Sequence, residues 1–320
     1  MRDSHPTDPE RLVQQKFSIR TLAGALALLA AIGLFDRSLA FVPDRQELGW
    51  RTARVELHPV RLDARGFAPL RLAGAWRLVS GDPRVGGVSA LAVDRGRLLA
   101  LTDSGVLIRF RPPGARAEIG ELPDGPGSGR FKRNRDAEAL VRDPAGRGWW
   151  VAFENRHELW LYDLGFRRAL QRIPLGMRRW RANRGIEGAA EEGASMLLID
   201  EKGDRLLRVT GSRARSIAIA DARGRISDVA PLGAGQYLAV ERRLTPFGFR
   251  NALAILDKSG SGYRFGRRIA LPLGPLENVE AIAIERLANG KRRLWLMTDD
   301  NFQPPLRTLL IALDWPGPRQ

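Results

Sequence analysis

The sequence predicts an all-β fold, a β-propeller built from four-stranded blades. One observation is an internal repeat, because residues 135–140 return as residues 184–189 and again as residues 276–282. The intervals between the repeats are 49, 49, 41 and 52 residues, counted between the equivalent positions Ser89, Glu138, Glu187, Asp228 and Glu280. A second observation is that each repeat holds short β-patterned runs bounded by turn residues, without a helical period. Repeats of this size with four antiparallel strands are typical of propeller blades.

The segment after Glu138 gives the order of elements within one repeat. A short apolar stretch follows Glu138, and a turn is expected at residues 143–148. The further strands are expected at residues 149–153, 159–162 and 170–175. After Ser89 the corresponding strands are expected at residues 90–93, 98–101, 106–110 and 117–122.

The last repeat lacks a fourth strand. It supplies residues 281–284, 294–297 and 308–313, while an unpaired strand is expected before the first full repeat, at residues 70–79. We expect residues 70–79 to pair with residues 308–313, which closes the ring and hides edge strands that would template aggregation. A domain closed in this way is expected to be a monomer. Five blades are accounted for, and residues 55–62 leave a sixth open.

The first 40 residues are predicted to be a targeting segment. Basic residues precede an apolar run at residues 22–35, and residues 38–40 resemble the small-x-small cleavage site of a secretory signal. The run is short for a membrane span, so a cleaved signal peptide and an uncleaved anchor both stay open. Because the basic flank stays inside, either alternative puts the propeller in the periplasm or outside the cell, with inner-membrane attachment in the second case. Residues 41–69 are expected to lead into a propeller spanning residues 70–320.

Composition limits the chemistry. The chain has no cysteine and three histidines, which excludes disulfides and thiolate metal sites and leaves little for a Ser-His-Asp triad. The net charge of +16 has two interpretations: the arginine usage of a GC-rich genome, or a field that attracts anions. No nucleic-acid-binding motif is present, so nucleic acid is not expected as a partner.

Acidic residues recur at the end of the second strand of each repeat. In an up-and-down blade this end shares a rim with the start of the first strand. The pairs expected to face each other are Glu138 with Glu154, Glu187 with Asp200, Asp228 with Glu241, and Glu280 with Asp299. Opposed carboxylates repel each other and need compensation, either from a hard cation such as calcium or from arginines such as Arg135, Arg184 and Arg242. The alternative is that these acids cap strand ends by accepting backbone N–H groups.

The segments around these acids resemble a known family. The segments that carry the resemblance are residues 134–140, 150–155, 159–162, 183–188, 278–282 and 298–302. They look like the phytase-like domain described as having esterase-like activity of phytase, over roughly residues 70–315. The resemblance implies an exported propeller related to calcium-dependent phytases, which hydrolyse phosphate monoesters in an acidic, calcium-lined cleft. Ser89 departs from the acidic pattern, which puts a metal site spanning that blade in doubt.

The functional hypothesis is metal-assisted hydrolysis of a small anionic ester. Bound cations would neutralise the phosphate and activate a water without a protein nucleophile. The predicted metal ligands are Glu138, Glu154, Glu187, Asp200, Glu280, Asp299 and Asp300. Glu138, Glu187 and Glu280 are the predicted catalytic residues, and Arg135 and Arg184 are predicted to bind phosphate oxygens. Two alternatives stay open: a non-catalytic propeller that binds a protein or a cell-envelope ligand, and a lactonase-like calcium propeller acting on carboxylic esters.

Overall fold

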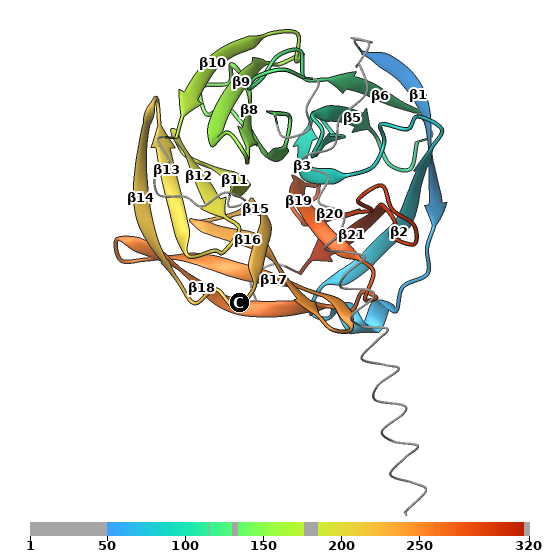
Figure 1. Cartoon of the computed structure of the whole chain (residues 1–320). Coiled ribbons are helices and arrows are strands. Elements are labelled where there is room, and N and C mark those ends of the chain that lie inside the picture. Colours follow the sequence, from blue (N-terminus) through green and yellow to red (C-terminus); the bar gives the residue numbers. More distant parts are fainter. Residues whose placement is uncertain (1–49, 115, 130–133, 176–184, 317–320) are drawn as a thin grey trace, which may run out of the picture.

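The computed structural model of the chain describes residues 50–114, 116–129, 134–175 and 185–316 (Figure 1). Within these ranges the regular elements are strands, apart from one short 3-10 helix, η2 (Ala64–Phe67). The strands form four-stranded antiparallel units arranged around a centre. The predicted all-β propeller fold is therefore confirmed.

Four units consist of strands that are consecutive in sequence. The first contains β3 (Val88–Asp94), β4 (Arg97–Thr102), β5 (Val106–Phe110) and β6 (Arg116–Glu121). The second contains β7 (Ala137–Arg142), β8 (Gly148–Phe153), β9 (Glu158–Asp163) and β10 (Ala169–Pro174). The third contains β11 (Ile186–Glu192), β12 (Ser195–Asp200), β13 (Arg205–Thr210) and β14 (Arg213–Ala220). The fourth contains β15 (Arg225–Gly233), β16 (Gln236–Thr245), β17 (Gly248–Ser259) and β18 (Gly262–Leu271).

The remaining unit joins the two ends of the described chain. It consists of β19 (Asn278–Arg286), β20 (Arg292–Asp299), β21 (Leu309–Trp315) and β2 (Arg71–Ser80). β2 pairs antiparallel with β21, from Arg71 opposite Asp314 to Arg77 opposite Leu309. The predicted closure of the ring by an N-terminal strand is therefore confirmed.

A further strand, β1 (Arg51–Pro59), lies outside the repeats. It pairs with β2 on one side and with β6 on the other, so it links the last unit to the first. β1 lies in residues 41–69, the segment predicted to precede the propeller. It extends the sheets of two units and does not form a separate sheet. The number of blades, five or six, stays a prediction.

The hydrophobic core lies between the units. The described residues contain five hydrophobic clusters, and each combines side chains of two neighbouring units. Leu99 and Leu101 of β4, for example, share a cluster with Trp149, Val151 and Phe153 of β8. All six residues of β8 are buried, because neighbouring units cover both faces of its sheet. The sequences of such inner strands are therefore continuously apolar and do not alternate between apolar and polar residues.

Two glycines show how the chain meets local demands. Asp94 pairs with Arg97 across the β3–β4 hairpin, so Arg95 and Gly96 form its two-residue loop. Their φ angles of +52° and +71° suit a type I′ turn, which needs positive φ at both central positions.

Gly188 lies where β11 meets β15, and a Cβ there would be 2.9 Å from the Val229 nitrogen. Only glycine allows the inner strands to approach so closely.

The predicted signal peptide or anchor, residues 1–40, lies outside the described residues. Among the residues that are described, no helix is both long enough and apolar enough to cross a bilayer.

Candidate functional site

A β-bulge recurs near the start of the first strand of each described unit. There, one residue of the first strand has no partner of its own on the second strand. These bulge residues are Ser89, Glu138, Glu187, Ser227 and Glu280. A bulge bends the strand and changes the direction of the extra side chain. The repeated sequence motif therefore marks the same bend in the first strand of every unit. The equivalent of Glu138 in the fourth unit is thus Ser227, one residue before the predicted Asp228.

A second set of polar residues lies on, or directly after, the second strands, each one residue after the position that pairs with the residue before the bulge. Thr102 pairs with Val88 and is followed by Asp103, and the other units repeat this arrangement. The members of the set are Asp103, Glu154, Glu201, Arg242 and Asp299. The register therefore corrects two predicted rim positions, because Glu201 takes the place of Asp200 and Arg242 takes the place of Glu241.

Both sets contribute to one cavity of about 800 Å³. Its acidic lining residues are Asp103, Asp136, Glu138, Glu154, Glu187, Glu201, Glu280 and Asp299. Its basic lining residues are Arg223, Arg225, Arg242 and Arg243. The arginines all belong to β15, β16 or the turn before β15, so the cavity is acidic with one basic wall. Such a cavity concentrates cations at one side and can hold an anion at the other.

Three carboxylates come together at the start of β7 and the end of β8. One oxygen each of Asp136, Glu138 and Glu154 lie within 4.8 Å of one another. Asp136 is buried, and the side-chain amide of Asn155 donates a hydrogen bond to its Oδ2. An all-oxygen set of three carboxylates fits a hard cation such as calcium or magnesium. We call these three residues the acidic triad.

The acidic triad contains one residue that sequence reasoning missed. The predicted pair Glu138 and Glu154 is brought together, whereas Asp136 lies within the repeated motif at residues 135–140 and is not among the predicted metal ligands. The available signal was its position two residues before Glu138, since such residues share one side of an extended chain.

Arg242 lies among the other acids of the cavity. Its Nη1 donates to a carboxylate oxygen of Glu280 and to Oδ1 of Asn278 at 2.9 Å. Its Nη2 lies 3.9 Å from Oε1 of Glu201. Burial alone would lower the pKa of Arg242, but the carboxylates of Glu280, Glu187 and Glu201 raise it overall. Arg242 is therefore a fixed positive charge inside the acidic ring.

Burial and mutual repulsion raise the pKa values of several lining carboxyls. Burial is the main cause of the strongly raised pKa of Glu187, and the charges of Glu154 and Glu201 add to it. The pKa of Asp299 is strongly raised for the same reason, with Asp103 and Glu280 as the repelling neighbours. Burial also raises the pKa of Glu280, although Arg242 opposes this shift. The cavity therefore favours additional positive charge, either as protons or as a cation.

Two predicted metal ligands point elsewhere. Oδ1 of Asp200 accepts a hydrogen bond from the Arg205 backbone at 3.2 Å, and burial together with Asp204 raises the pKa of Asp200 to about 6. Oδ1 of Asp300 accepts from the backbone nitrogens of Gly87 and Phe302, at 3.0 and 3.1 Å. Neither residue lines the cavity. Both accept backbone N–H groups, so the capping alternative describes them better than the metal hypothesis.

The two predicted substrate-binding arginines have different outcomes. Arg135 is 7 % exposed, and its Nη1 donates to the carbonyls of Pro126 and Asn134, at 2.9 and 3.3 Å. It holds the loop before β7 in place and does not line the cavity, so a role in substrate binding does not fit its position. Arg184 lies outside the described residues.

The arginines at the mouth of the cavity were not expected from the sequence. Arg223 and Arg243 are exposed, and Nη2 of Arg243 donates to the Arg223 carbonyl at 2.8 Å. Neither guanidinium forms an ion pair with a carboxylate in the part of the chain that is described. Arg225, in contrast, pairs with Glu201. Arg223 and Arg243 are thus available to an anion that enters the cavity.

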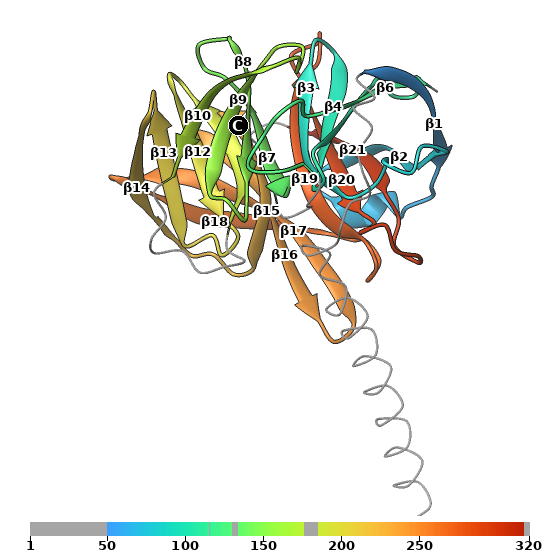
Figure 2. The same ribbon diagram turned by 45° about the horizontal axis from the view of Figure 1, so that its top comes forward.

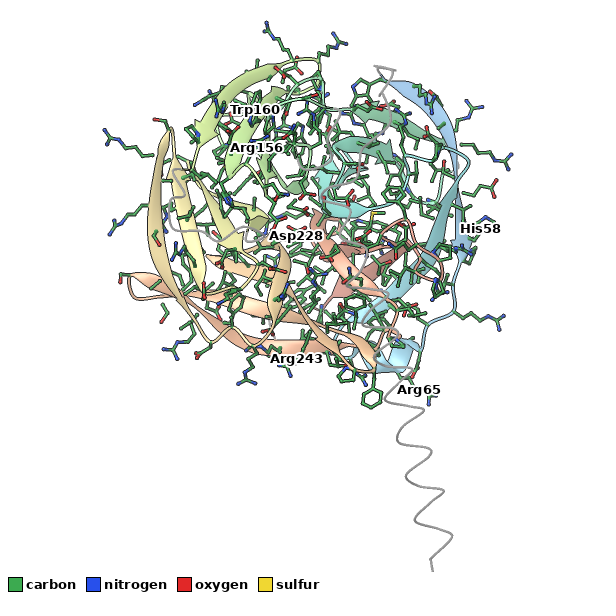
Figure 3. All side chains as sticks on the ribbon, in the orientation of Figure 1. His58, Arg65, Arg156, Trp160, Asp228 and Arg243 are labelled. Atoms are coloured by element: carbon green, nitrogen blue, oxygen red, sulfur yellow. The ribbon has the colours of Figure 1, made fainter. Side chains whose placement is uncertain are left out.

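Asp228 lies near the centre of the ring and has a structural role (Figure 3). Its Oδ1 accepts from the Val229 nitrogen at 2.7 Å and its Oδ2 from the Ile282 nitrogen at 2.8 Å, which links β15 to β19. The residue is buried, and this burial raises its pKa well above the ordinary value. Here too the carboxyl accepts backbone N–H groups.

Replacing Asp228 by asparagine should lower the free energy of unfolding by about 1–3 kcal/mol. An amide has one acceptor oxygen, so one buried backbone N–H would face an NH₂ group instead of an oxygen. Urea unfolding followed by fluorescence measures the change. Asp221→Asn, at an exposed residue, is the control and should change stability by less than about 0.5 kcal/mol. Equal stability of the two variants would contradict the structural role of Asp228.

One comparison with known proteins agrees with the sequence resemblance. The family model described as "Phytase-like: Esterase-like activity of phytase" matches residues 83–302. Glutaminyl cyclase from Myxococcus xanthus is 12 % identical, with a TM-score of 0.48, over 83 % of this chain and 96 % of that one. A chain of a nidogen/laminin complex is 13 % identical, with a TM-score of 0.44, over 82 % of this chain and 96 % of that one. No curated protein matches the sequence.

The two structural likenesses are weak, so the description of the fold rests on the strand pairing itself. The family match is different, because it covers more than half of the sequence, from the segment before β3 to the end of the Asp299–Phe302 turn. It includes the acidic triad, the bulge residues and Arg242. The chain therefore belongs to the phytase-like family described as having esterase-like activity of phytase.

Proposed function

We propose that the protein is an exported hydrolase that uses a cation, calcium in the first instance, to cleave small anionic esters, with phosphate monoesters as the leading substrate class. The observation that carries the proposal is the acidic triad, whose three oxygens converge at the wall of a cavity large enough for a small ligand. Membership of the phytase-like family supports it. The same proposal treats the protein as a monomer without a nucleic-acid partner.

The side chains of the cavity divide into three roles. Asp136, Glu138 and Glu154 would hold the cation, which would supply charge neutralisation of the ester and activation of a water. Arg223 and Arg243, at the basic wall, would bind the anionic group through their planar guanidinium forks. This assignment replaces Arg135, whose side chain is committed to the loop before β7.

Glu187 is suited to the transfer of a proton. It lines the same cavity, and burial raises its pKa well above the ordinary value for a glutamate. A carboxyl with a raised pKa holds its proton to higher pH than usual and can donate that proton to a leaving alkoxide. Arg242 would keep Glu280 and Glu201 in place, because its guanidinium bonds to the first and lies near the second.

Millimolar calcium should raise the melting temperature of the full-length chain relative to excess chelator, because a ligand that binds only the folded state stabilises it by mass action. At a concentration about 100 times the dissociation constant, the gain is about 2.7 kcal/mol. Differential scanning fluorimetry measures the shift, and hydrolysis of generic phosphate and carboxylate esters is followed in parallel. Magnesium at the same concentration serves as the comparison ion.

The outcomes separate the candidate functions. A calcium-dependent shift with phosphate ester cleavage supports the proposal, whereas cleavage of carboxylic esters alone would favour the lactonase-like alternative. A melting temperature that is the same with calcium, magnesium and chelator would reject the cation site and leave a non-catalytic binding propeller.

A further inference from the structure

One hairpin is much longer than its counterparts in the other units. The β16–β17 ladder runs from Gln236 opposite Asp257 to Thr245 opposite Gly248. In the first unit the corresponding strands, β4 and β5, have six and five residues, whereas β16 and β17 have ten and twelve. Figure 2 shows that the extra length projects out of the body of the propeller. We call residues 243–250 the hairpin tip.

The hairpin tip exposes apolar side chains. Phe247 is 65 % exposed and Leu244 is 44 % exposed, which makes them the two most exposed large hydrophobic residues of the described chain. Other exposed residues of this kind, such as Leu164 at 38 % and Leu170 at 40 %, lie on other units. Two large apolar groups at the end of one projection indicate a surface that is covered by another apolar phase.

The conformation of the tip is well defined. Oγ1 of Thr245 accepts from the Phe247 nitrogen at 3.2 Å and donates to the Gly248 carbonyl at 2.8 Å. The Phe249 nitrogen donates to the Pro275 carbonyl at 2.8 Å, which anchors the base of the tip to the propeller body. The hydrogen bonds of the turn therefore hold Phe247 in its solvent-exposed position.

The hairpin tip is also positively charged. Arg243 and Arg250 are directly opposite each other in the ladder, and both are exposed. Two like charges in such a cross-strand pair repel each other. Neither arginine pairs with a carboxylate among the residues that are described, and the tip itself contains no acidic residue. An anionic surface would relieve the repulsion.

We propose that the hairpin tip inserts into the interface of an anionic phospholipid bilayer. Aromatic and aliphatic side chains at the end of the tip, with arginines just behind them, match the layers of such an interface, where acyl chains lie below anionic headgroups. The positive charge of the tip favours an anionic bilayer as the occupant, and an uncleaved anchor at residues 22–35, one of the two alternatives for that segment, would keep the tip near such a bilayer. Since Arg243 and Leu244 also line the cavity, insertion places the cavity mouth at the membrane surface.

The absence of cysteine from the sequence allows a direct test with the full-length chain. Pro246→Cys, labelled with a polarity-sensitive fluorophore, puts a reporter beside Phe247 without removing it. Leu170→Cys on β10 is the matched control, because Leu170 is similarly exposed on another unit. Both variants keep residues 1–49, so attachment through that segment affects them equally. The vesicles contain phosphatidylcholine with or without phosphatidylglycerol, and doxyl-labelled acyl chains quench any label that enters the bilayer.

With anionic vesicles, the label at position 246 should shift to the blue and be quenched, while the label at position 170 should do neither. Adding Phe247→Ser to the first variant should lower the partition coefficient for the vesicles at least about tenfold, as expected for the loss of one buried phenylalanine. Equal behaviour of the two labels on anionic vesicles would overturn the proposal. A blue shift without vesicles that grows with protein concentration would overturn it as well and identify a second copy of the chain as the occupant. Neither readout depends on ester hydrolysis, so the result is independent of the proposed function.

Discussion

Replacing Asp136 by asparagine and Glu138 by glutamine together should abolish the calcium-dependent rise in melting temperature and lower ester hydrolysis roughly 10³-fold. The two amides keep the size and shape of the side chains but remove two negative charges from the acidic triad. Calcium affinity depends strongly on the number of charged ligands, and Glu154 would be left as the only carboxylate of the three. Fluorimetry with calcium and chelator and steady-state hydrolysis assays measure the two effects.

The matched control changes two acids at the opposite end of inner strands. Asp94 on β3 and Glu191 on β11 line a different cavity, on the far side of the ring from the acidic triad. The double variant Asp94→Asn with Glu191→Gln removes the same total charge and should keep both the calcium response and the hydrolysis. If the two double variants respond to calcium alike, the cation does not bind at the acidic triad.

Replacing Arg242 by methionine should lower the free energy of unfolding at neutral pH by about 3–5 kcal/mol, the usual cost of removing one partner of a buried charge pair. Arg242 has a side chain that is 19 % exposed, and it bonds to Glu280. Its charge also opposes the raised pKa of Glu187. Without it these carboxylates repel each other in a buried site. Urea unfolding at several pH values measures the change, and Arg225→Met, at a 67 % exposed arginine, is the control with an expected cost below about 1 kcal/mol.

The pH dependence of the Arg242→Met variant has a definite sign. Glu187 and Glu280 have raised pKa values in the folded state, so the folded state binds more protons than the unfolded state between the unfolded and the folded pKa. Stability in the absence of a cation should therefore rise as the pH falls from neutral toward the unfolded pKa of a glutamate, about 4.3. Removing Arg242 raises the folded pKa values further and should steepen this rise, and excess calcium should substitute in part for the lost charge. A variant that is as stable as the parent at neutral pH would contradict the role of Arg242.

At lower pH other carboxyls decide the stability. The hydrogen bond from Arg84 holds the pKa of Asp82 far below its usual value. This stabilisation is present above the unfolded pKa of an aspartate and is lost as the pH falls through the lower folded value. The two groups act in separate pH ranges, so the parent protein without a cation should be most stable at about pH 4, between the unfolded pKa values of aspartate and glutamate.

The fold could be predicted from the sequence because its signals are redundant. Each repeat carries its own turns and apolar runs, and the missing fourth strand of the last repeat matched the unpaired strand around Trp76. The positions of the site residues were harder, because they depend on single-residue register. A shift of one residue along a strand moves a side chain to the other face, and this separates Glu201 from the predicted Asp200 and Arg242 from the predicted Glu241.

The roles of individual charged residues also depended on contacts that no sequence pattern reveals. Arg135 belongs to the repeated motif and was predicted to bind substrate, yet it is buried against carbonyls of a neighbouring loop. Arg223 and Arg243 belong to no repeated motif, and only the folding of the turn before β15 beside the end of β16 brings them to the cavity. The bulges, which aim Glu138 and its equivalents, coincide with the repeated motif, but the residue types of the motif do not by themselves reveal a bulge.

The pairing of β2 with β21 has a consequence for the way the chain is made. Arg71 of β2 donates a hydrogen bond to the side chain of Asp314 in β21, 243 residues further along the chain. During synthesis, β2 emerges early and keeps an unpaired hydrogen-bonding edge until nearly all the remaining strands have followed. Loop-closure entropy rises only slowly with length, so the long separation of β2 and β21 in sequence costs little stability. The time during which the edge of β2 is unpaired is what exposes the chain to aggregation. A chain that ends before β21 would keep its acidic triad, but β2 and β20 would each be left with an unpaired hydrogen-bonding edge. Such edges would make the incomplete chain a target for quality-control proteases.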